Sequence, residues 1–158
     1  SGAHFNPAVT IAFAVARHFK WREVLYYVAG QFIGAILATE TLHLLLGDIA
    51  QLGATLPSNG AAQSFGIEVL LTAVLMLVII SVATDTRAVG APAAIAIGAV
   101  IAVDALWGGP ISGASMNPAR SFGPSLIAGI WTDQWVYWIA PVIGAIVAAL
   151  LYKWLQSE

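Results

Sequence analysis

Residues 1–9 read SGAHFNPAV, and residues 112–120 read SGASMNPAR. The two copies of this motif are offset by 111 positions. A second matching pair follows, QFIGAILA at residues 31–38 and PVIGAIVA at residues 141–148, with an offset of 110. Because the register hardly drifts, the chain is predicted to contain two related structural halves.

The composition places most of this chain in lipid. Of its 158 residues, 59% are hydrophobic and 9% are charged, and the mean hydropathy is +0.86. A soluble globular domain has about 25% charged residues, so an ordinary soluble enzyme is excluded. The net charge of −2 argues against a nucleic-acid partner. The absence of cysteine excludes a disulfide framework, a thiolate zinc site and a cysteine nucleophile.

Long uncharged stretches predict four helices that cross a bilayer, since a span needs about 20 apolar residues. The expected spans are residues 21–46, 61–83, 89–107 and 132–155. The polar stretch 47–60 is predicted to be a loop, and residues 84–88 a charged turn. The fold class is therefore an all-α membrane protein.

Two further apolar segments, residues 7–19 and 118–129, are too short to span. Each begins with Asn-Pro, and Asn at the N-cap followed by Pro at the first helical position is a strong helix start. Ten helical residues cover about 15 Å, or half the hydrocarbon core. Each segment is thus predicted to be a half-helix that begins at mid-membrane. Irregular backbone at that depth is tolerated only inside protein or beside a wet cavity, which indicates a pore or a transport site.

The order of the elements predicts an inverted repeat. Three spans separate the two half-helices, so the two copies enter from opposite faces, with the site at their pseudo-twofold interface. Within the second repeat, two spans precede the half-helix, whereas no span precedes the first half-helix. By symmetry we expect two more N-terminal spans in a six-span protein. The chain would then be one partial, N-terminally truncated channel domain over residues 1–158, with the end of the first repeat at 1–60 and the second repeat at 61–158.

The Asn-Pro-Ala triplets supply the chemistry expected at such a site. They are Asn6, Pro7 and Ala8 in the first copy, and Asn117, Pro118 and Ala119 in the second. Each half-helix carries about half a positive charge at its N-terminus, so two that meet at the midplane oppose cations. The two Asn amides could both donate to one passing oxygen and so interrupt proton hopping. A single triplet would be read as a plain N-cap, but two symmetric copies favour the pore.

These motifs closely resemble the aquaporin family, the major intrinsic proteins. Residues 109–110 and 112–116, GP and SGASM, together with ATDTRA at 83–88, are most similar to the nodulin-like intrinsic proteins of plants and their bacterial relatives. The resemblance implies a six-span bundle with two half-helices, assembled as a homotetramer in the plasma membrane. It further implies a passive channel for water and small neutral solutes, with glycerol and metalloid acids among them. It implies no enzyme activity and no cofactor.

The resemblance also implies a selectivity filter. Arg120 occupies the position of the family's filter arginine, with a structural pairing to Asp133 as the alternative. Ala105 and Ala114 occupy two further walls, and the fourth wall would come from the missing spans. Strict water channels carry His at the position of Ala105. The smaller alanine favours a wider pore in this chain.

Other positions leave the choice of solute open. Ser121 stands where glycerol facilitators have Asp, and Tyr137-Trp138 matches the aromatic pair of water channels. A strict water channel is therefore an alternative. A secondary transporter is a second one, although no acidic residue stands beside either Asn-Pro-Ala triplet to bind a coupling ion.

The sequence also suggests roles for a glutamate, a histidine and a pair of glycines. By resemblance, Glu68 braces the re-entrant loop backbone. His4 either lines the inner vestibule or makes a plain loop hydrogen bond. The small-x-x-x-small pattern of Gly30 and Gly34 predicts close helix packing in the bundle. The three histidines do not share a metal-ligand spacing, so no metal site is expected.

Overall fold

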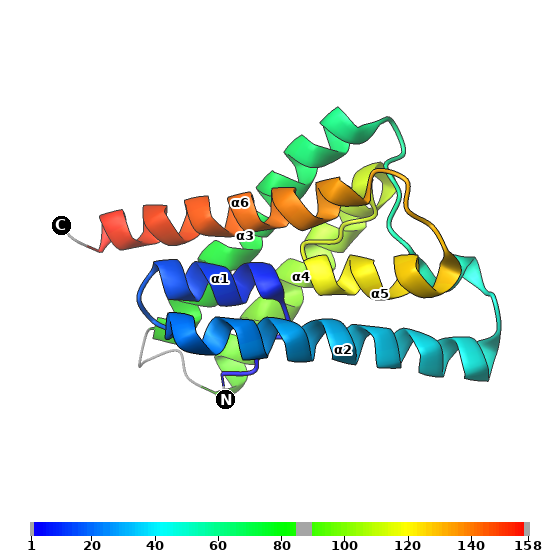
Figure 1. Ribbon diagram of the computed structural model, residues 1–158. Helices are drawn as coiled ribbons and strands as arrows, with labels where there is room; N and C mark the ends of the chain where they lie inside the picture. The colour runs from blue at the N-terminus through cyan, green and yellow to red at the C-terminus, as the bar shows by residue number, and fades with distance from the viewer. Residues whose placement is uncertain (1, 85–89, 157–158) are drawn as a thin grey trace.

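The computed structural model describes residues 2–84 and 90–156, and every element in this part of the chain is helical (Figure 1). The elements in chain order are α1 (Pro7–Val15), α2 (Trp21–Leu46), the short 3-10 helix η1 (Ala50–Gly53), α3 (Ala61–Thr84), α4 (Ala91–Ser112), α5 (Pro118–Ala128) and α6 (Gln134–Leu155).

The four predicted spans are confirmed as α2, α3, α4 and α6, each long and apolar enough to cross a membrane. The predicted end of the third span at residue 107 is wrong, because α4 continues through Pro110 to Ser112. The helix stops where Gly113 adopts the left-handed conformation (φ +86°) and its N–H bonds the Gly109 carbonyl. The predicted start of this span and most of the turn at 84–88 lie outside the described residues.

The first half-helix is shorter than predicted. It ends at Val15 rather than at residue 19. Arg17 has a positive φ of 68°, and the His18 N–H closes the turn onto the Phe13 carbonyl at 2.9 Å. The apolar pattern runs on past this point, but the chain must already turn to enter α2.

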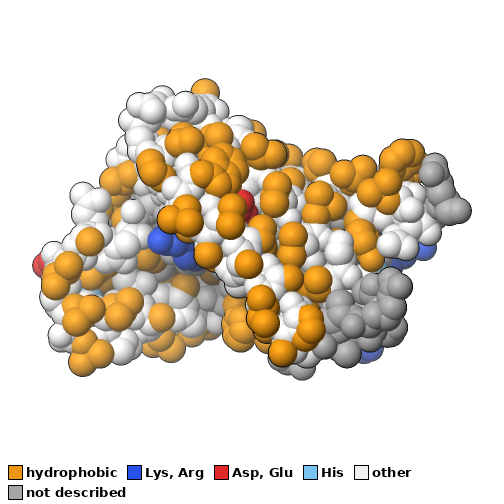
Figure 2. All heavy atoms as spheres, turned by 180° about the vertical axis from the view of Figure 1, so that it is seen from behind, with side chains coloured by type: hydrophobic (Ala, Val, Ile, Leu, Met, Phe, Trp, Pro, Cys, Tyr) orange, Lys and Arg blue, Asp and Glu red, His pale blue; other side chains and the backbone are white. Residues whose placement is uncertain are grey.

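The two half-helices lie nearly end to end, with their N-termini facing each other (Figure 1). In this view α2 runs along one side of them and α6 along the other, and α3 and α4 lie behind. One apolar core joins α1, α3 and α6, with Val9, Phe13, Met76 and Ile80 among its buried members. Many large hydrophobic side chains are exposed, as expected of a protein that faces lipid, and Figure 2 shows hydrophobic side chains over much of one face.

Glycines allow three close helix contacts. A Cβ at Gly144 of α6 would lie 2.2 Å from the Val69 carbonyl oxygen of α3. A Cβ at Gly123 of α5 would lie 2.6 Å from the Ala35 carbonyl oxygen of α2, and one at Gly108 of α4 would meet the Leu71 side chain of α3. Small residues let membrane helices approach closely.

The pattern Gly30-x-x-x-Gly34 was expected to build the bundle in the same way. Within the described chain it does not, because a Cβ at either glycine meets nothing within 4 Å. Both residues line an open cavity instead. Gly34 is the repeat counterpart of Gly144, so the same position is packed in one half of the chain and open in the other.

Candidate functional site

Each half-helix begins at an asparagine that caps it. The Asn6 Oδ1 accepts from the Ala8 N–H at 2.9 Å, and the Asn117 Oδ1 accepts from the Ala119 N–H at 3.1 Å. Pro follows each cap at the first helical position. The amide oxygens are thus committed to local capping.

The amide nitrogens connect the two halves of the repeat. Asn6 Nδ2 donates to the Met116 carbonyl at 2.7 Å, and Asn117 Nδ2 donates to the Phe5 carbonyl at 2.9 Å. Each asparagine therefore holds the residue that precedes the other one. An amide nitrogen has two N–H groups, so one remains on each side for a further partner.

The loops before the two caps have the same unusual backbone. Phe5 and Met116 have φ values of 52° and 53°, and Ala3 and Ala114 have 46° and 45°. For residues other than glycine this left-handed conformation costs about 1–2 kcal/mol. Such strain persists only where the surroundings hold it in place.

Glu68 of α3 holds the second loop. It is fully buried, and its carboxylate accepts from the Ser112 hydroxyl at 2.7 Å and from the N–H groups of Ser115 and Met116 at 2.8 Å each. Tyr137 of α6 is also buried, and its hydroxyl donates to the Ser112 carbonyl at 2.6 Å.

The predicted filter residues share one cavity of about 320 Å³. Ala105, Ala114 and Arg120 all line it, and so do Asn6 and Asn117. Two of these walls are methyl groups, and the third carries a guanidinium. Tyr137 and Trp138 are not among the residues that line this cavity.

Arg120 is held by a backbone carbonyl. Its Nη1 donates to the Gly53 carbonyl at 2.6 Å, in the loop between α2 and α3. Within residues 2–84 and 90–156, Arg120 makes no ion pair with Asp133 or with any other carboxylate. Gly53 could not be predicted as a partner from the sequence, because a carbonyl in an irregular loop leaves no signal in the residue pattern.

His4 makes a local hydrogen bond, one of the two roles expected of it, and its role in the inner vestibule stays a prediction. Its Nδ1 lies 3.1 Å from the Thr10 hydroxyl, which also accepts from Gln31 Nε2 at 2.9 Å. The imidazole ring packs among the rings of Phe13, Phe19 and Tyr27. His4 also lines the open cavity beside Asn117 and Arg120.

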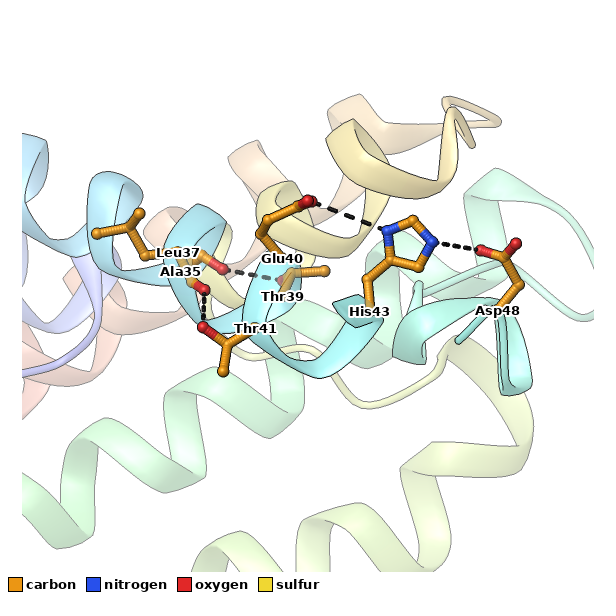
Figure 3. Close-up of polar contacts among 7 residues, drawn as sticks. All are labelled: Ala35, Leu37, Thr39, Glu40, Thr41, His43 and Asp48. Atoms are coloured by element: carbon orange, nitrogen blue, oxygen red, sulfur yellow. Dashed lines mark hydrogen bonds and ion pairs between the residues drawn. The ribbon is translucent and has the colours of Figure 1, made fainter. Parts of the chain in front are cut away.

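A polar cluster closes the C-terminal end of α2 (Figure 3). His43 Nε2 lies 3.1 Å from the Asp48 carboxylate, and His43 Nδ1 lies 3.9 Å from that of Glu40. In the same helix Thr41 donates to the Leu37 carbonyl at 2.7 Å. In the part of the chain that the structure describes, no group of His, Asp and Glu side chains could hold a metal ion.

The family model described as "Major intrinsic protein" matches residues 1–152. The chain belongs to the major intrinsic protein family. Its four apolar helices and this membership make it an integral, multi-pass membrane protein.

The curated relatives of this major intrinsic protein include plant aquaporins. Aquaporin NIP1-1 of Zea mays is 50% identical over 99% of this chain and 56% of its own length. Nodulin-26 of Glycine max is 50% identical over 97% of this chain and 57% of its own length. The chain thus spans about half the length of the curated relatives it matches, and the resemblance to nodulin-like proteins is confirmed.

The fold is shared with a solved channel structure. The X-ray structure of the aquaglyceroporin from Plasmodium falciparum matches with a TM-score of 0.86 and 26% identity, over 97% of this chain and 72% of that chain. The predicted aquaporin-like fold class is confirmed by this match.

Proposed function

We propose that this chain forms the pore region of a passive channel for water and small neutral solutes that excludes protons and other ions. The observation that carries the proposal is the reciprocal pair of bonds from Asn6 to Met116 and from Asn117 to Phe5. These bonds bring two half-helix N-termini together and leave one amide N–H on each side. A solute oxygen that accepts from both asparagine amides could not also accept from its neighbour in the pore, which would interrupt the chain of hydrogen-bonded molecules.

Charge supports the exclusion of ions. Each half-helix N-terminus carries about half a positive charge, and Arg120 adds a full charge beside them. Positive half-helix ends and an arginine are the elements that exclude protons and cations in aquaporin-type pores. Neither α1 nor α5 has an acidic residue in its first turn to offset this field.

The residues that line the cavity support the proposal that solutes larger than water pass through it. Ala105 and Ala114 are the smallest side chains that still make an apolar wall, and Arg120 supplies donors in the same cavity. A polyol or an undissociated hydroxy acid such as boric acid needs this combination. Each solute hydroxyl that leaves water unpaired would raise the barrier by about 1–3 kcal/mol.

The same observations argue against coupled transport. A coupling cation needs carboxylates or free carbonyls near the midplane. Glu68 is the acidic residue in contact with the second loop, and its carboxylate already accepts three hydrogen bonds.

Further helices are part of the proposed working channel. Thr39 is the single buried residue of α2, whereas α6, its counterpart in the repeat, has nine. Large apolar side chains of α2 such as Leu25, Tyr26 and Leu37 are 63–77% exposed. We propose that two more spans cover part of this face in a six-span protomer, and that the protomer assembles as a homotetramer in the plasma membrane.

Solute uptake by proteoliposomes tests the proposal. The full-length gene product that contains these 158 residues is reconstituted, and stopped-flow light scattering follows water, glycerol and boric acid. We expect all three to cross faster than in empty vesicles, at rates independent of Na⁺ and pH gradients and without a proton leak. Fast water flux without glycerol or boric acid uptake would instead identify a strict water channel. Accumulation driven by an ion gradient would identify a transporter.

A further inference from the structure

The Arg120 guanidinium is hydrogen-bonded to a loop that lies outside both half-helices. The loop carbonyl that accepts from Arg120 belongs to Gly53. Gly53 lies in a stretch of left-handed backbone, with φ of 53° at Gln51, 55° at Leu52 and 79° at Gly53 itself. Such a stretch needs an anchor to hold one carbonyl at a fixed place.

Thr55 is that anchor. It is 1% exposed, and it is the one buried residue between positions 47 and 60. Its carbonyl accepts from Gln134 Nε2 of α6 at 3.1 Å. Its side chain packs on Gly113, where an added Cβ would lie 3.2 Å from the Thr55 Cβ and Cγ2. Two elements of the second repeat thus hold this loop residue.

The Thr55 hydroxyl begins a chain of three hydroxyl groups. It donates to Ser121 Oγ at 2.7 Å, and Ser121 Oγ lies 2.5 Å from Ser115 Oγ. Ser115 Oγ donates to the Asn117 carbonyl at 3.0 Å. Since each hydroxyl has a single proton, Ser121 must donate to Ser115. The chain therefore runs in one direction, from the loop to the N-cap of α5.

Two neighbouring residues of α5 consequently hold the same loop. Arg120 bonds Gly53, and Ser121 bonds Thr55 two residues later. We propose that Thr55 and Ser121 are positioning residues of the filter, which fix the Gly53 carbonyl and through it the Arg120 guanidinium. The inference rests on the proposed role of Arg120 as the filter arginine.

Fixing the guanidinium should matter most for solutes such as glycerol, which give up several hydrogen bonds to water when they enter the filter. A guanidinium held at one point presents its remaining N–H donors at a fixed place to glycerol. Without the Thr55–Ser121 bond, Gly53 moves and these donors are no longer aligned. Glycerol then loses about one hydrogen bond in the filter, whereas water, which is smaller, keeps more of its own partners. The ratio of glycerol to water permeability should fall.

Hydroxyl variants of the full-length gene product test this in proteoliposomes with equal amounts of reconstituted protein. Thr55→Val removes the hydroxyl at nearly constant shape, and Thr55→Ser keeps it. We expect Thr55→Val to lower the glycerol-to-water permeability ratio about fivefold, the factor that one lost hydrogen bond of about 1 kcal/mol predicts. Thr55→Ser should restore the ratio. Thr41→Val is the matched control, because its hydroxyl bonds its own helix on an exposed face.

Ser121→Ala removes the same bond from the half-helix side, and it serves in place of Thr55→Val if that variant fails to fold. The double variant Thr55→Val/Ser121→Ala should lower the ratio no further than either single one. The proposal would be overturned if, in both single variants, the glycerol-to-water permeability ratio rises or stays within about twofold of the unmutated value. One lost hydrogen bond predicts a larger change than this. An equal loss of water and glycerol flux would also overturn the proposal, because a merely structural role predicts that result.

Arg120→Val separates this inference from the proposed function. If Arg120→Val changes the ratio and the Thr55 and Ser121 variants do not, only the positioning role is wrong. If Arg120→Val also leaves the ratio and the proton leak unchanged, Arg120 is not a filter residue and the proposed function fails with it.

Discussion

The side-chain amide of Asn6 donates to the backbone carbonyl of Met116 at 2.7 Å, across 110 residues of sequence. This bond fastens the cap of one half-helix to the loop that enters the other. Together with its counterpart from Asn117 to Phe5, it makes each asparagine both a local cap and a long-range tie. The sequence alone predicts the first role, because Asn before Pro is a local signal.

Asn6→Asp should weaken this tie while keeping the cap. The carboxylate still accepts from the Ala8 N–H, but it cannot donate to the Met116 carbonyl. We expect a loss of about 1–3 kcal/mol in stability, since a buried acceptor loses its partner. We also expect a sodium leak, because a negative charge replaces a neutral group between two positive helix ends.

Thermal unfolding in detergent and sodium efflux from proteoliposomes measure the two effects. Asn59→Asp in the exposed loop is the control for the added charge. An unchanged melting temperature together with a sodium-tight vesicle would show that the Asn6 amide has neither role.

Glu68→Gln should destabilise the second re-entrant loop. The glutamate carboxylate accepts three hydrogen bonds with two oxygens. Glutamine offers one oxygen and places an NH₂ group against a backbone N–H. Each donor left without a partner costs about 1–3 kcal/mol, so the melting temperature and the permeability per reconstituted protein should both fall.

Glu40→Gln is the matched control for Glu68→Gln, because the Glu40 side chain is 46% exposed and its contact to His43 is long. Exposed ion pairs contribute little to stability. Equal melting temperatures for the two variants would contradict the bracing role of Glu68.

Ala105→His combined with Ala114→Phe should narrow the cavity. Both residues line the space that Arg120 also lines, so two larger side chains occupy the room that glycerol needs. We expect glycerol uptake to collapse while water flux survives in stopped-flow assays. Val103→Phe is the control, at an exposed position of α4, the helix that contains Ala105. It should change neither the glycerol rate nor the water rate. Glycerol uptake that persists in the double variant would mean that Ala105 and Ala114 do not set the width.

Ala114→Cys should make the channel sensitive to mercurial reagents. The 158 residues contain no cysteine, so the new thiol at the cavity wall is a defined target. Bound mercury would occlude the cavity and lower water flux, and a reducing agent should restore it. Leu106→Cys places the thiol on an exposed side chain of α4 and should leave the flux unchanged. If the mercurial reagent does not lower water flux through the Ala114→Cys variant, Ala114 does not belong to the pore wall.

The elements that depend on local physics can be predicted from the residues alone. A helix in lipid must satisfy its own backbone groups, so apolar runs of about 20 residues already indicate α2, α3, α4 and α6. Asn-Pro starts a helix through contacts within three residues, so the beginnings of α1 and α5 were also predictable. The 111-residue repeat added the inverted arrangement, because an odd number of spans reverses the second copy.

The ends of the helices and the hydrogen-bond partner of each side chain depend instead on contacts between distant segments. α4 passes its Gly-Gly-Pro stretch and stops only at Gly113, which must also lie close to Thr55. The acceptor for Arg120 is the Gly53 carbonyl, 67 residues upstream, and every residue type carries such a carbonyl. Only folding brings that group to the guanidinium, because hydrogen bonds between distant segments leave no periodicity or motif in the sequence.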